Sequence, residues 1–321
     1  MVTRRHFLAL SGAAALWAPH AARAGGGVAT FGGSAFGSYW RLTAPLGIDQ
    51  PSIAAMLDGM VVDKERVFSP YRPDSVLTAF NMSRTTGIQP THVDLRAVLA
   101  SALEIAASSE GAFDPAVGPI VGRYGFGPLS DGSPGHFSQL AVDGHGIGKD
   151  APGLCIDLCG IAKGHALDAM RTVLAGAGVT DYLLDLGGEL TASGRHPSGR
   201  DWQVMIDGSE RSGAPIVLAL AGRSVATSGN AAQGYELGGR RVGHIIDPHA
   251  NVPAAGPVYS VSVLSENALI ADGWATALMA APYPQALAMA GSKGIDALFL
   301  VSNGGRLVPT TTGRFGAHLV S

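Results

Sequence analysis

The sequence predicts an α+β protein, in which helices pack on a mixed or antiparallel β-sheet within a single compact unit. Three observations lead to this prediction. Hydrophobic residues form 46% and charged residues 15% of the 321 residues, which is enough apolar material for a substantial core. The chain contains 45 glycines and 19 prolines, so it has many turns and little room for coiled coil. The strand-like segments of the second half follow one another through turns and not through helices, which is typical of antiparallel pairing.

The individual elements follow from the spacing of apolar residues. Helical spacing predicts helices over residues 52–68, 94–109, 161–174, 267–281 and 284–290. Gly176 and Gly178 close the third of these segments, and Pro282 follows the fourth, as expected beyond a helix end. Short apolar runs predict strands over residues 182–186, 202–206, 216–220, 258–264 and 297–301, and residues 224–227 are interpreted as a strand that ends in a turn.

The first 24 residues have the pattern of an export signal. A pair of arginines, Arg4 and Arg5, precedes an apolar run over residues 7–18 and an Ala-Arg-Ala cleavage pattern that ends at Ala24. The run is too short to span a bilayer comfortably, so we expect a periplasmic protein without a stable membrane anchor. The arginine pair favours a twin-arginine signal, with an ordinary secretory signal as the alternative. Residues 25–34 are rich in glycine and predict a flexible lead-in, which leaves residues 35–321 as the domain.

Charge and cysteine content exclude some functions. The formal net charge is −3 and no basic block is present, which disfavours electrostatic capture of nucleic acid. The two cysteines, Cys155 and Cys159, are too few for a zinc finger. We expect two small buried side chains, with a disulfide as the alternative in an oxidising compartment.

Glycine-rich stretches do not predict a nucleotide-binding loop of a known kind. Residues 144–150 suggest a P-loop, but the spacing is wrong and Asp150 stands where Ser or Thr is needed to hold magnesium. No G-x-G-x-x-G motif follows a strand and opens a helix, so a Rossmann fold has no support.

The segment 157–168 is more informative, because a short apolar run leads into Asp157 and a helix is expected to begin near Gly160. A small residue lets a ligand approach the backbone closely, and a helix N-terminus attracts phosphate. Lys163 adds a point charge suited to phosphate or carboxylate. Asp157 accepts from a polar ligand or caps the helix. The alternative interpretation is a capped helix with a surface lysine.

Asp272 and Thr276 lie four residues apart on the predicted helix 267–281, so their oxygens face one side. A carboxylate, a hydroxyl and a nearby backbone carbonyl would form a hard-oxygen site suited to magnesium. The alternative is an aspartate favoured by the helix dipole and a threonine that bonds back to a carbonyl of its own helix.

His244 lies beside an apolar pair and three residues before Asp247, so it is a candidate acid or base near neutral pH. A structural histidine is the alternative, and a zinc pair with His249 lacks a convincing third ligand.

Two further turn-rich segments, 68–75 and 111–115, contain aromatic residues that would clamp a flat ring or cover a core edge.

Taken together and in order along the chain, these segments resemble the ApbE family, the periplasmic FAD:protein FMN transferases. The resemblance runs from about residue 36 to residue 309. The matching segments are 68–75 with Asn81, 111–119, 157–168, 185–189, 226–230, 244–248 and 271–278.

The resemblance implies an ApbE-like (T-fold-like) α+β fold and a defined reaction. FMN would move from FAD to a Thr or Ser hydroxyl of an acceptor flavoprotein of a membrane or periplasmic electron-transfer complex, with release of AMP. The metal would be Mg²⁺, with Mn²⁺ as an alternative. Its ligands would be the Gly160 carbonyl, Asp272 and Thr276. His244 would be the catalytic base, with Asp272 a less suitable one. The flavin contacts would be Phe36, Tyr71, Ala112, Phe113, Asp114, Asp157, Lys163 and Ile245.

The sequence departs from the family pattern in three places, at Phe36-Gly37-Ser38, at Ala116 and at His249-Ala250-Asn251. The family usually has Met-Gly-Thr, Thr and Thr-Gly there.

Two other functions remain open on the same residues. One is an FAD pyrophosphatase with water as acceptor, and the other is a non-catalytic flavin-binding assembly protein.

Overall fold

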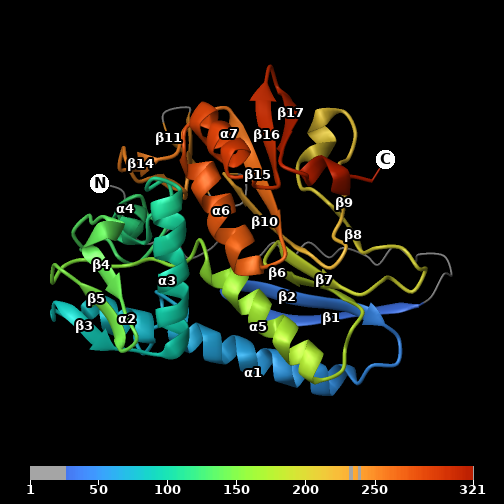
Figure 1. Cartoon of the computed structure of the whole chain (residues 1–321), viewed down its shortest axis with the longest axis horizontal. Coiled ribbons are helices and arrows are strands. Elements are labelled where there is room, and N and C mark those ends of the chain that lie inside the picture. The colour runs from blue at the N-terminus through green and yellow to red at the C-terminus, as the bar shows by residue number, and fades with distance from the viewer. Residues whose placement is uncertain (1–26, 231–233, 238–239, 321) are drawn as a thin grey trace.

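A computed structural model describes residues 27–230, 234–237 and 240–320. The expected export signal over residues 1–24 lies outside the described residues. An eight-stranded sheet forms the centre of the molecule, with strand order β1-β2-β6-β7-β10-β15-β16-β17 (Figure 1). Every neighbouring pair in it is antiparallel. The strands are β1 (Val28–Ala35), β2 (Ser38–Pro45), β6 (Tyr182–Leu186), β7 (Glu189–Ser193), β10 (Ser224–Gly229), β15 (Val258–Ser265), β16 (Ala297–Asn303) and β17 (Arg306–Thr312).

Four helices cover one face of this sheet, namely α1 (Gln50–Phe68), α5 (Ala162–Gly176), α6 (Ala268–Ala280) and α7 (Tyr283–Ser292) (Figure 1). Alternate strand residues point to them. Val261 and Val263 of β15 pack with Ala271 and Ala275 of α6, whereas Leu264 belongs to the core on the opposite face. The period of two along each strand therefore separates two hydrophobic layers.

The opposite face is covered by a short two-stranded ribbon of β8 (Gln203–Met205) and β9 (Val217–Ala219). Trp202 beside β8 and Phe315 near the C-terminus pack there against Leu298 and Leu300 of β16. Two short 3₁₀ helices, η3 (Ser209–Ser212) and η4 (Phe315–His318), complete this layer.

A smaller layer lies beside the sheet and not on its face (Figure 1). It surrounds α3 (Val93–Ser108) and contains a three-stranded sheet of order β3-β5-β4. Its elements are α2 (Val76–Met82), β3 (Gly87–Pro90), η1 (Pro115–Val117), α4 (Gly118–Arg123), η2 (Phe137–Gln139), β4 (Leu140–Val142) and β5 (Gly146–Lys149). Leu269 and Ala277 of α6 belong to the same apolar core as Leu95 and Leu99 of α3, so the two layers share a core.

Two hairpins, β11 (Gly234–Leu237) with β12 (Arg240–Gly243) and β13 (Ile246–Asp247) with β14 (Val252–Pro253), connect β10 to β15. No helix within the described part of the chain combines the length and apolar character needed to cross a membrane.

The predicted α+β fold class is confirmed. The sequence allowed either a mixed or an antiparallel sheet, and the central sheet is antiparallel. The five predicted helices are present as α1, α3, α5, α6 and α7, and the six predicted strands as β6, β8, β9, β10, β15 and β16. The short helices α2 and α4 were not predicted, because one or two turns give too few apolar positions to reveal a period. Residues 144–148 do not form a phosphate loop, since Gly146 and Gly148 lie in β5.

The prediction of a flexible lead-in over residues 25–34 is wrong from residue 28 onward, because those residues form edge strand β1. Their glycines permit close packing instead of flexibility. A Cβ on Gly32 would lie 2.2 Å from the Trp40 carbonyl oxygen, and one on Gly33 would lie 2.5 Å from Asp58 Oδ1. Gly32 thus makes room for the backbone of β2, and Gly33 for the side chains of Asp58 and Trp40.

Both cysteines are free thiols, with Cys155 buried and Cys159 exposed. The prediction of a buried side chain therefore holds for Cys155 and is wrong for Cys159, which lies in the turn before α5.

Candidate active site

The segment that leads into α5 is held in place by two buried polar side chains. The Asn81 amide forms two hydrogen bonds with the backbone of Ile156, of 2.9 Å to its carbonyl and 2.8 Å from its N–H. Lys149 is also buried, and its Nζ donates to the carbonyl oxygens of Phe80, Asn81 and Leu154 at 3.0 to 3.3 Å. These bonds join α2, β5 and the segment, so the turn that follows has a defined position.

Asp157 stabilises this turn and does not cap the helix. Its Oδ1 accepts the backbone N–H of Cys159 at 2.8 Å, and its own N–H donates to the Pro115 carbonyl at 2.7 Å. The N-cap residue of α5 is Ile161, which provides no side-chain hydrogen bond. Two of the first N–H groups of α5 are used within the protein, since that of Ala162 donates to the Leu158 carbonyl at 2.8 Å and that of Gly164 to Asp272. The Lys163 N–H and the positive end of the helix dipole remain to attract an anion.

Thr276 of α6 faces Gly160 in the turn before α5, although 116 residues separate them. Its hydroxyl donates to the Gly160 carbonyl oxygen at 3.2 Å and lies 3.4 Å from Ser228 Oγ at the end of β10. A Cβ on Gly160 would lie 2.8 Å from Thr276 Oγ1, so this approach requires glycine. The alternative that Thr276 bonds back to its own helix is therefore wrong.

Asp272 is buried one turn earlier on α6, with 4% of its surface exposed. Its Oδ2 accepts the backbone N–H of Gly164 in the first turn of α5 at 2.9 Å. Asp272 thus lies at the positive end of the α5 dipole, not that of its own helix. Burial raises the pKa of Asp272 well above its usual value, and the Glu189 carboxylate beside it raises it further.

Lys163 and Glu189 complete a group of three ionisable side chains with Asp272. Lys163 of α5 donates from its Nζ to Oε1 of Glu189, which lies in β7. Desolvation opposes the charge of Lys163, but the Glu189 and Asp272 carboxylates outweigh it and raise the pKa of the ammonium. Glu189 is 3% exposed, and its Oε2 has no hydrogen-bond partner among the described residues. Two carboxylates therefore share one ammonium group in a desolvated position.

The oxygens gathered here fit a divalent cation of the magnesium type. With both carboxyl groups ionised, two negative charges would lie beside one ammonium group, and the raised pKa of Asp272 reflects the cost of that charge. A bound cation would remove this cost and keep both carboxylates ionised. Carboxylate, hydroxyl and carbonyl oxygens are the ligands that Mg²⁺ prefers. The described residues contain no cluster of three His, Cys, Asp or Glu side chains arranged for a metal.

One of the predicted flavin contacts, Phe36, lies in a tight turn. Phe36 and Gly37 connect β1 to β2, both at positive φ of +50° and +69°. The Phe36 N–H donates to Glu65 Oε1 of α1 at 2.7 Å. A bulky residue in this region costs on the order of 1 kcal/mol, which the surrounding structure must offset.

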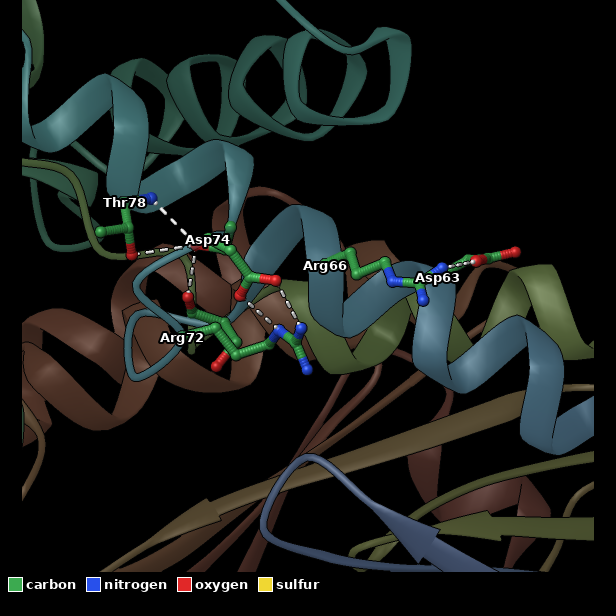
Figure 2. A network of polar contacts seen from close by, with 7 residues as sticks. Asp63, Arg66, Arg72, Asp74 and Thr78 are labelled. Carbon is green, nitrogen blue, oxygen red and sulfur yellow. Dashed lines mark hydrogen bonds and ion pairs between the residues drawn. The ribbon is translucent and has the colours of Figure 1, made fainter.

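Tyr71 is 67% exposed on the loop between α1 and α2. Figure 2 shows how this loop is ordered: Arg72 pairs with Asp74 through two hydrogen bonds, while Arg66 and Asp63 pair separately along α1. The backbone N–H of Thr78 donates to Ser75 Oγ at the start of α2. Tyr71 is therefore presented to solvent from a well-defined loop.

The predicted contacts at residues 112–114 are buried. Phe113 packs in the core around α3, and Ala112 is 4% exposed. Asp114 accepts backbone N–H groups from Ala116 at 2.7 Å and Phe137 at 3.0 Å, which makes it the N-cap of η1. Burial raises its pKa despite these bonds. Phe113 and Asp114 therefore have a structural role. A ligand contact from Asp114 would have to share carboxylate oxygens that already accept backbone N–H groups.

His244 follows β12 and is half-buried, with its neighbour Ile245 packed in the core against Ala271 and Ala275 of α6. A Cβ on the preceding Gly243 would lie 2.0 Å from Asn230 Oδ1, so this stretch lies against the end of β10. The same end of β10 contributes Ser228 beside Thr276. The stretch that contains the predicted base therefore lies next to the end of β10, the strand that also contacts Thr276.

Comparison with known proteins agrees with this geometry. The family model of the ApbE family matches residues 36–299. This chain belongs to the ApbE family. Its ApbE relatives include the FAD:protein FMN transferase of Salmonella typhimurium, 31% identical over 90% of this chain and 89% of that protein. That of Escherichia coli strain K12 is 28% identical over 90% of this chain and 88% of its own length.

Solved ApbE structures have the same fold. The apo form of flavinyl transferase ApbE from Pseudomonas stutzeri superposes with a TM-score of 0.83 at 30% identity, over 92% of this chain and 98% of that one. Flavin transferase ApbE from Vibrio cholerae gives a TM-score of 0.81 at 26% identity, over 92% of this chain and 100% of that one.

Two residues of the site were not singled out from the sequence, Glu189 and Ser228. Glu189 lies in the segment 185–189, which the family resemblance includes, and its position directly after the Gly187-Gly188 turn was the available signal. Nothing in the sequence indicated that it would meet Lys163, because the two residues come from different elements.

Proposed function

We propose that this protein is an FAD:protein FMN transferase that moves FMN from FAD to a Thr or Ser hydroxyl of an acceptor protein and releases AMP. One observation supports it above the others. Asp272, Lys163, Glu189, Thr276 and the Gly160 carbonyl converge at the start of α5 in a chain of the ApbE family. A phosphoanhydride carries negative charge, and this arrangement combines an ammonium group, the positive end of a helix dipole and oxygens that can hold a cation.

The proposed metal is Mg²⁺, with Mn²⁺ as an alternative, held by the Gly160 carbonyl, Asp272 and Thr276. When bound, Mg²⁺ neutralises charge on the pyrophosphate oxygens and holds them in position. Glu189 would add a negative charge beside the site, and Lys163 would remain its ion-pair partner. The unpaired Glu189 Oε2 and the two carboxylates around one ammonium support a cation at this place.

His244 is the proposed catalytic base. The acceptor hydroxyl oxygen attacks the phosphorus of the FMN half, the bond from that phosphorus to the AMP oxygen breaks, and His244 takes the hydroxyl proton. Asp272 is less suitable, because a ligand of a cation stays ionised and directs its lone pairs to it. Lys163 would stabilise the charge that develops on the leaving phosphate.

The proposed flavin contacts remain Phe36, Tyr71, Ala112, Phe113, Asp114, Asp157, Lys163 and Ile245. Of these, the exposed Tyr71 has a ring accessible for stacking, and the buried Phe113 would contribute an apolar wall. The proposed acceptor is a flavoprotein subunit of a membrane or periplasmic electron-transfer complex. Export by a twin-arginine signal to the periplasm would bring enzyme and acceptor together.

The proposal is tested with FAD, MgCl₂ and a purified flavoprotein domain that carries an acceptor threonine. Covalent flavin is read as fluorescence that survives denaturing electrophoresis, and AMP is measured in parallel. We expect a fluorescent acceptor band that requires Mg²⁺ and falls at least about 100-fold in rate in Asp272→Asn. Asp63→Asn, an exposed aspartate on α1, is the matched control and retains activity.

Two other results would contradict the proposal. Free FMN and AMP without a band, with several acceptor domains, would indicate an FAD pyrophosphatase. Bound FAD without any product would indicate a flavin-binding assembly protein.

A further inference from the structure

An aromatic cluster joins three separate parts of the chain next to His244. The ring of Phe126, beyond the end of α4, stacks on Tyr235 of β11 with ring centres 5.4 Å apart and planes 23° apart. The ring of His244 meets Phe126 edge-on, at 6.2 Å and 63°. Both geometries are favourable arrangements of aromatic rings.

The backbone under Phe126 is fixed by the end of α4. Gly125 has a positive φ of +83°. The N–H of Phe126 donates to the Val121 carbonyl at 3.1 Å, and that of Gly125 to the Gly122 carbonyl at 3.0 Å. This is the Schellman motif, in which a glycine ends the helix and directs the next residue outward. The backbone position of Phe126 is therefore set by the end of its own helix, and Tyr235 of the hairpin supports the ring.

Two tyrosine hydroxyls tie the same loop to its surroundings. Tyr71 Oη donates to the Phe126 carbonyl at 3.0 Å, and Tyr235 Oη donates to the Tyr124 carbonyl at 3.2 Å. Tyr235 thus contacts the loop through both its ring and its hydroxyl. The β11–β12 hairpin, which leads directly into His244, is attached to the end of α4 through these contacts.

We propose that Phe126 is a positioning residue that holds the His244 imidazole in the orientation needed to accept the proton of the acceptor hydroxyl. The inference rests on the proposed function, in which His244 is the base. A base acts only when its nitrogen lies within hydrogen-bond reach of the proton, and small displacements reduce the rate strongly. Phe126 meets the edge of the imidazole with a side chain that has no proton to exchange, so it affects orientation without taking part in the chemistry.

The test compares Phe126→Leu, which removes the ring and keeps an apolar side chain, with Phe126→Tyr, which restores the ring. Tyr235→Leu removes the stacking partner and leaves Phe126 in place. Phe31→Leu is the matched control, because Phe31 is a partly buried phenylalanine that meets Trp40 edge-on at 6.0 Å on edge strand β1.

The kcat for FMN transfer and the KM for FAD are measured with Mg²⁺ and the acceptor domain. The carbon-bound proton resonances of His244 are recorded by NMR without FAD, assigned with His244→Gln.

We expect Phe126→Leu to lower kcat roughly 10-fold and to change the KM for FAD less than about 2-fold. The His244 resonances should shift, because the ring beside them is removed. Phe126→Tyr should restore kcat and the resonances, Tyr235→Leu should give a partial loss, and Phe31→Leu should keep the wild-type kcat.

Three results would overturn the inference. Unchanged kcat and unchanged His244 resonances in Phe126→Leu would show that the ring does not position the base. A raised KM for FAD at unchanged kcat would make Phe126 part of the flavin pocket. Wild-type protein that transfers no FMN would overturn the proposed function and this inference together, whereas failure of the Phe126 variants alone leaves the proposed function standing.

Discussion

At the scale of single residues, the site depends on charges that the fold keeps away from water. Asp272 and Glu189 are both buried, and Lys163 is their shared counter-charge. Burial of an ionised carboxylate is costly, so such a group persists where it has a task. Asp272 receives the Gly164 N–H as well, whereas one oxygen of Glu189 has no partner in the described chain. Glu189 is therefore the member of the group with the clearest unmet requirement for a cation.

Glu189→Gln is expected to weaken Mg²⁺ binding by roughly 10- to 100-fold, because it removes one negative charge beside the proposed ligands. The thermal midpoint without metal should not fall, since the change also removes repulsion with Asp272, which remains to pair with Lys163. The measurement is the rise of the thermal midpoint with MgCl₂. Glu210→Gln, on exposed η3, should respond to Mg²⁺ like the wild type. An unchanged Mg²⁺ response in Glu189→Gln would exclude a role for Glu189 at the metal.

At the scale of elements, the site exists because α5 and α6 are bonded to each other at two levels (Figure 1). Asp272 of α6 accepts an N–H from the first turn of α5. In return, Asp168 of α5 accepts the first two N–H groups of α6, from Ala268 at 3.1 Å and Leu269 at 3.0 Å. Each helix thus satisfies donors at the start of the other, which fixes Thr276 opposite Gly160.

Asp168→Ala is expected to lower the free energy of unfolding by about 1 to 2 kcal/mol, the usual effect of losing a helix cap, because two N–H groups of α6 lose their acceptor. It should also lower the transfer rate, since α6 would be held less firmly relative to Gly160. Urea denaturation and the acceptor-labelling assay measure the two effects. Asp63→Ala removes only the exposed ion pair with Arg66 and should cost less than about 0.5 kcal/mol. Equal stability of the two variants would argue against the reciprocal cap.

At the scale of the whole molecule, three helices from both layers meet at His165. It lies in α5, its ring meets Phe68 of α1 at 5.4 Å, and its Nε2 is 3.8 Å from Asp94 Oδ1 of α3. Lys64 of α1 holds the other oxygen of Asp94 at 2.6 Å. Burial lowers the pKa of His165, with a further lowering by Lys64, and these effects exceed the opposite influence of Asp94. The junction therefore favours neutral His165.

This lowered pKa predicts that stability falls in mild acid. Below the ordinary histidine pKa of about 6.5, the unfolded chain gains a proton that the folded chain resists, so the unfolded state gains stability as pH falls. Between pH 7.5 and 5.5, this single group can remove at most about 1.4 kcal/mol of unfolding free energy. His165→Gln should lose less stability over that range than the wild type, as measured by urea denaturation at both pH values. His145→Gln, at an exposed position, should follow the wild type. The same pH dependence in all three proteins would show that His165 is not responsible.

Much of the site was predictable because local sequence determines local chemistry. The spacing of Asp272 and Thr276 on one helix, and the small Gly160 before a helix with Lys163 in its first turn, made these residues candidates, and the family resemblance implied the ligand set. The pattern could not separate a ligand contact from a structural role at Asp114, because the two backbone N–H groups that it binds come from the tertiary arrangement.

The amino-acid sequence by itself determined the α+β class, the five longer helices and the residue types of the site, since apolar period, turn residues and motif spacing are properties of short segments. Only the tertiary structure decided that residues 28–35 form an edge strand, that Glu189 meets Lys163, and that Phe126 and Tyr235 lie beside His244. The physical reason is the same in each case. Strand pairing, buried ion pairs and ring contacts join residues far apart in the chain, and their free energy arises only when several elements pack together.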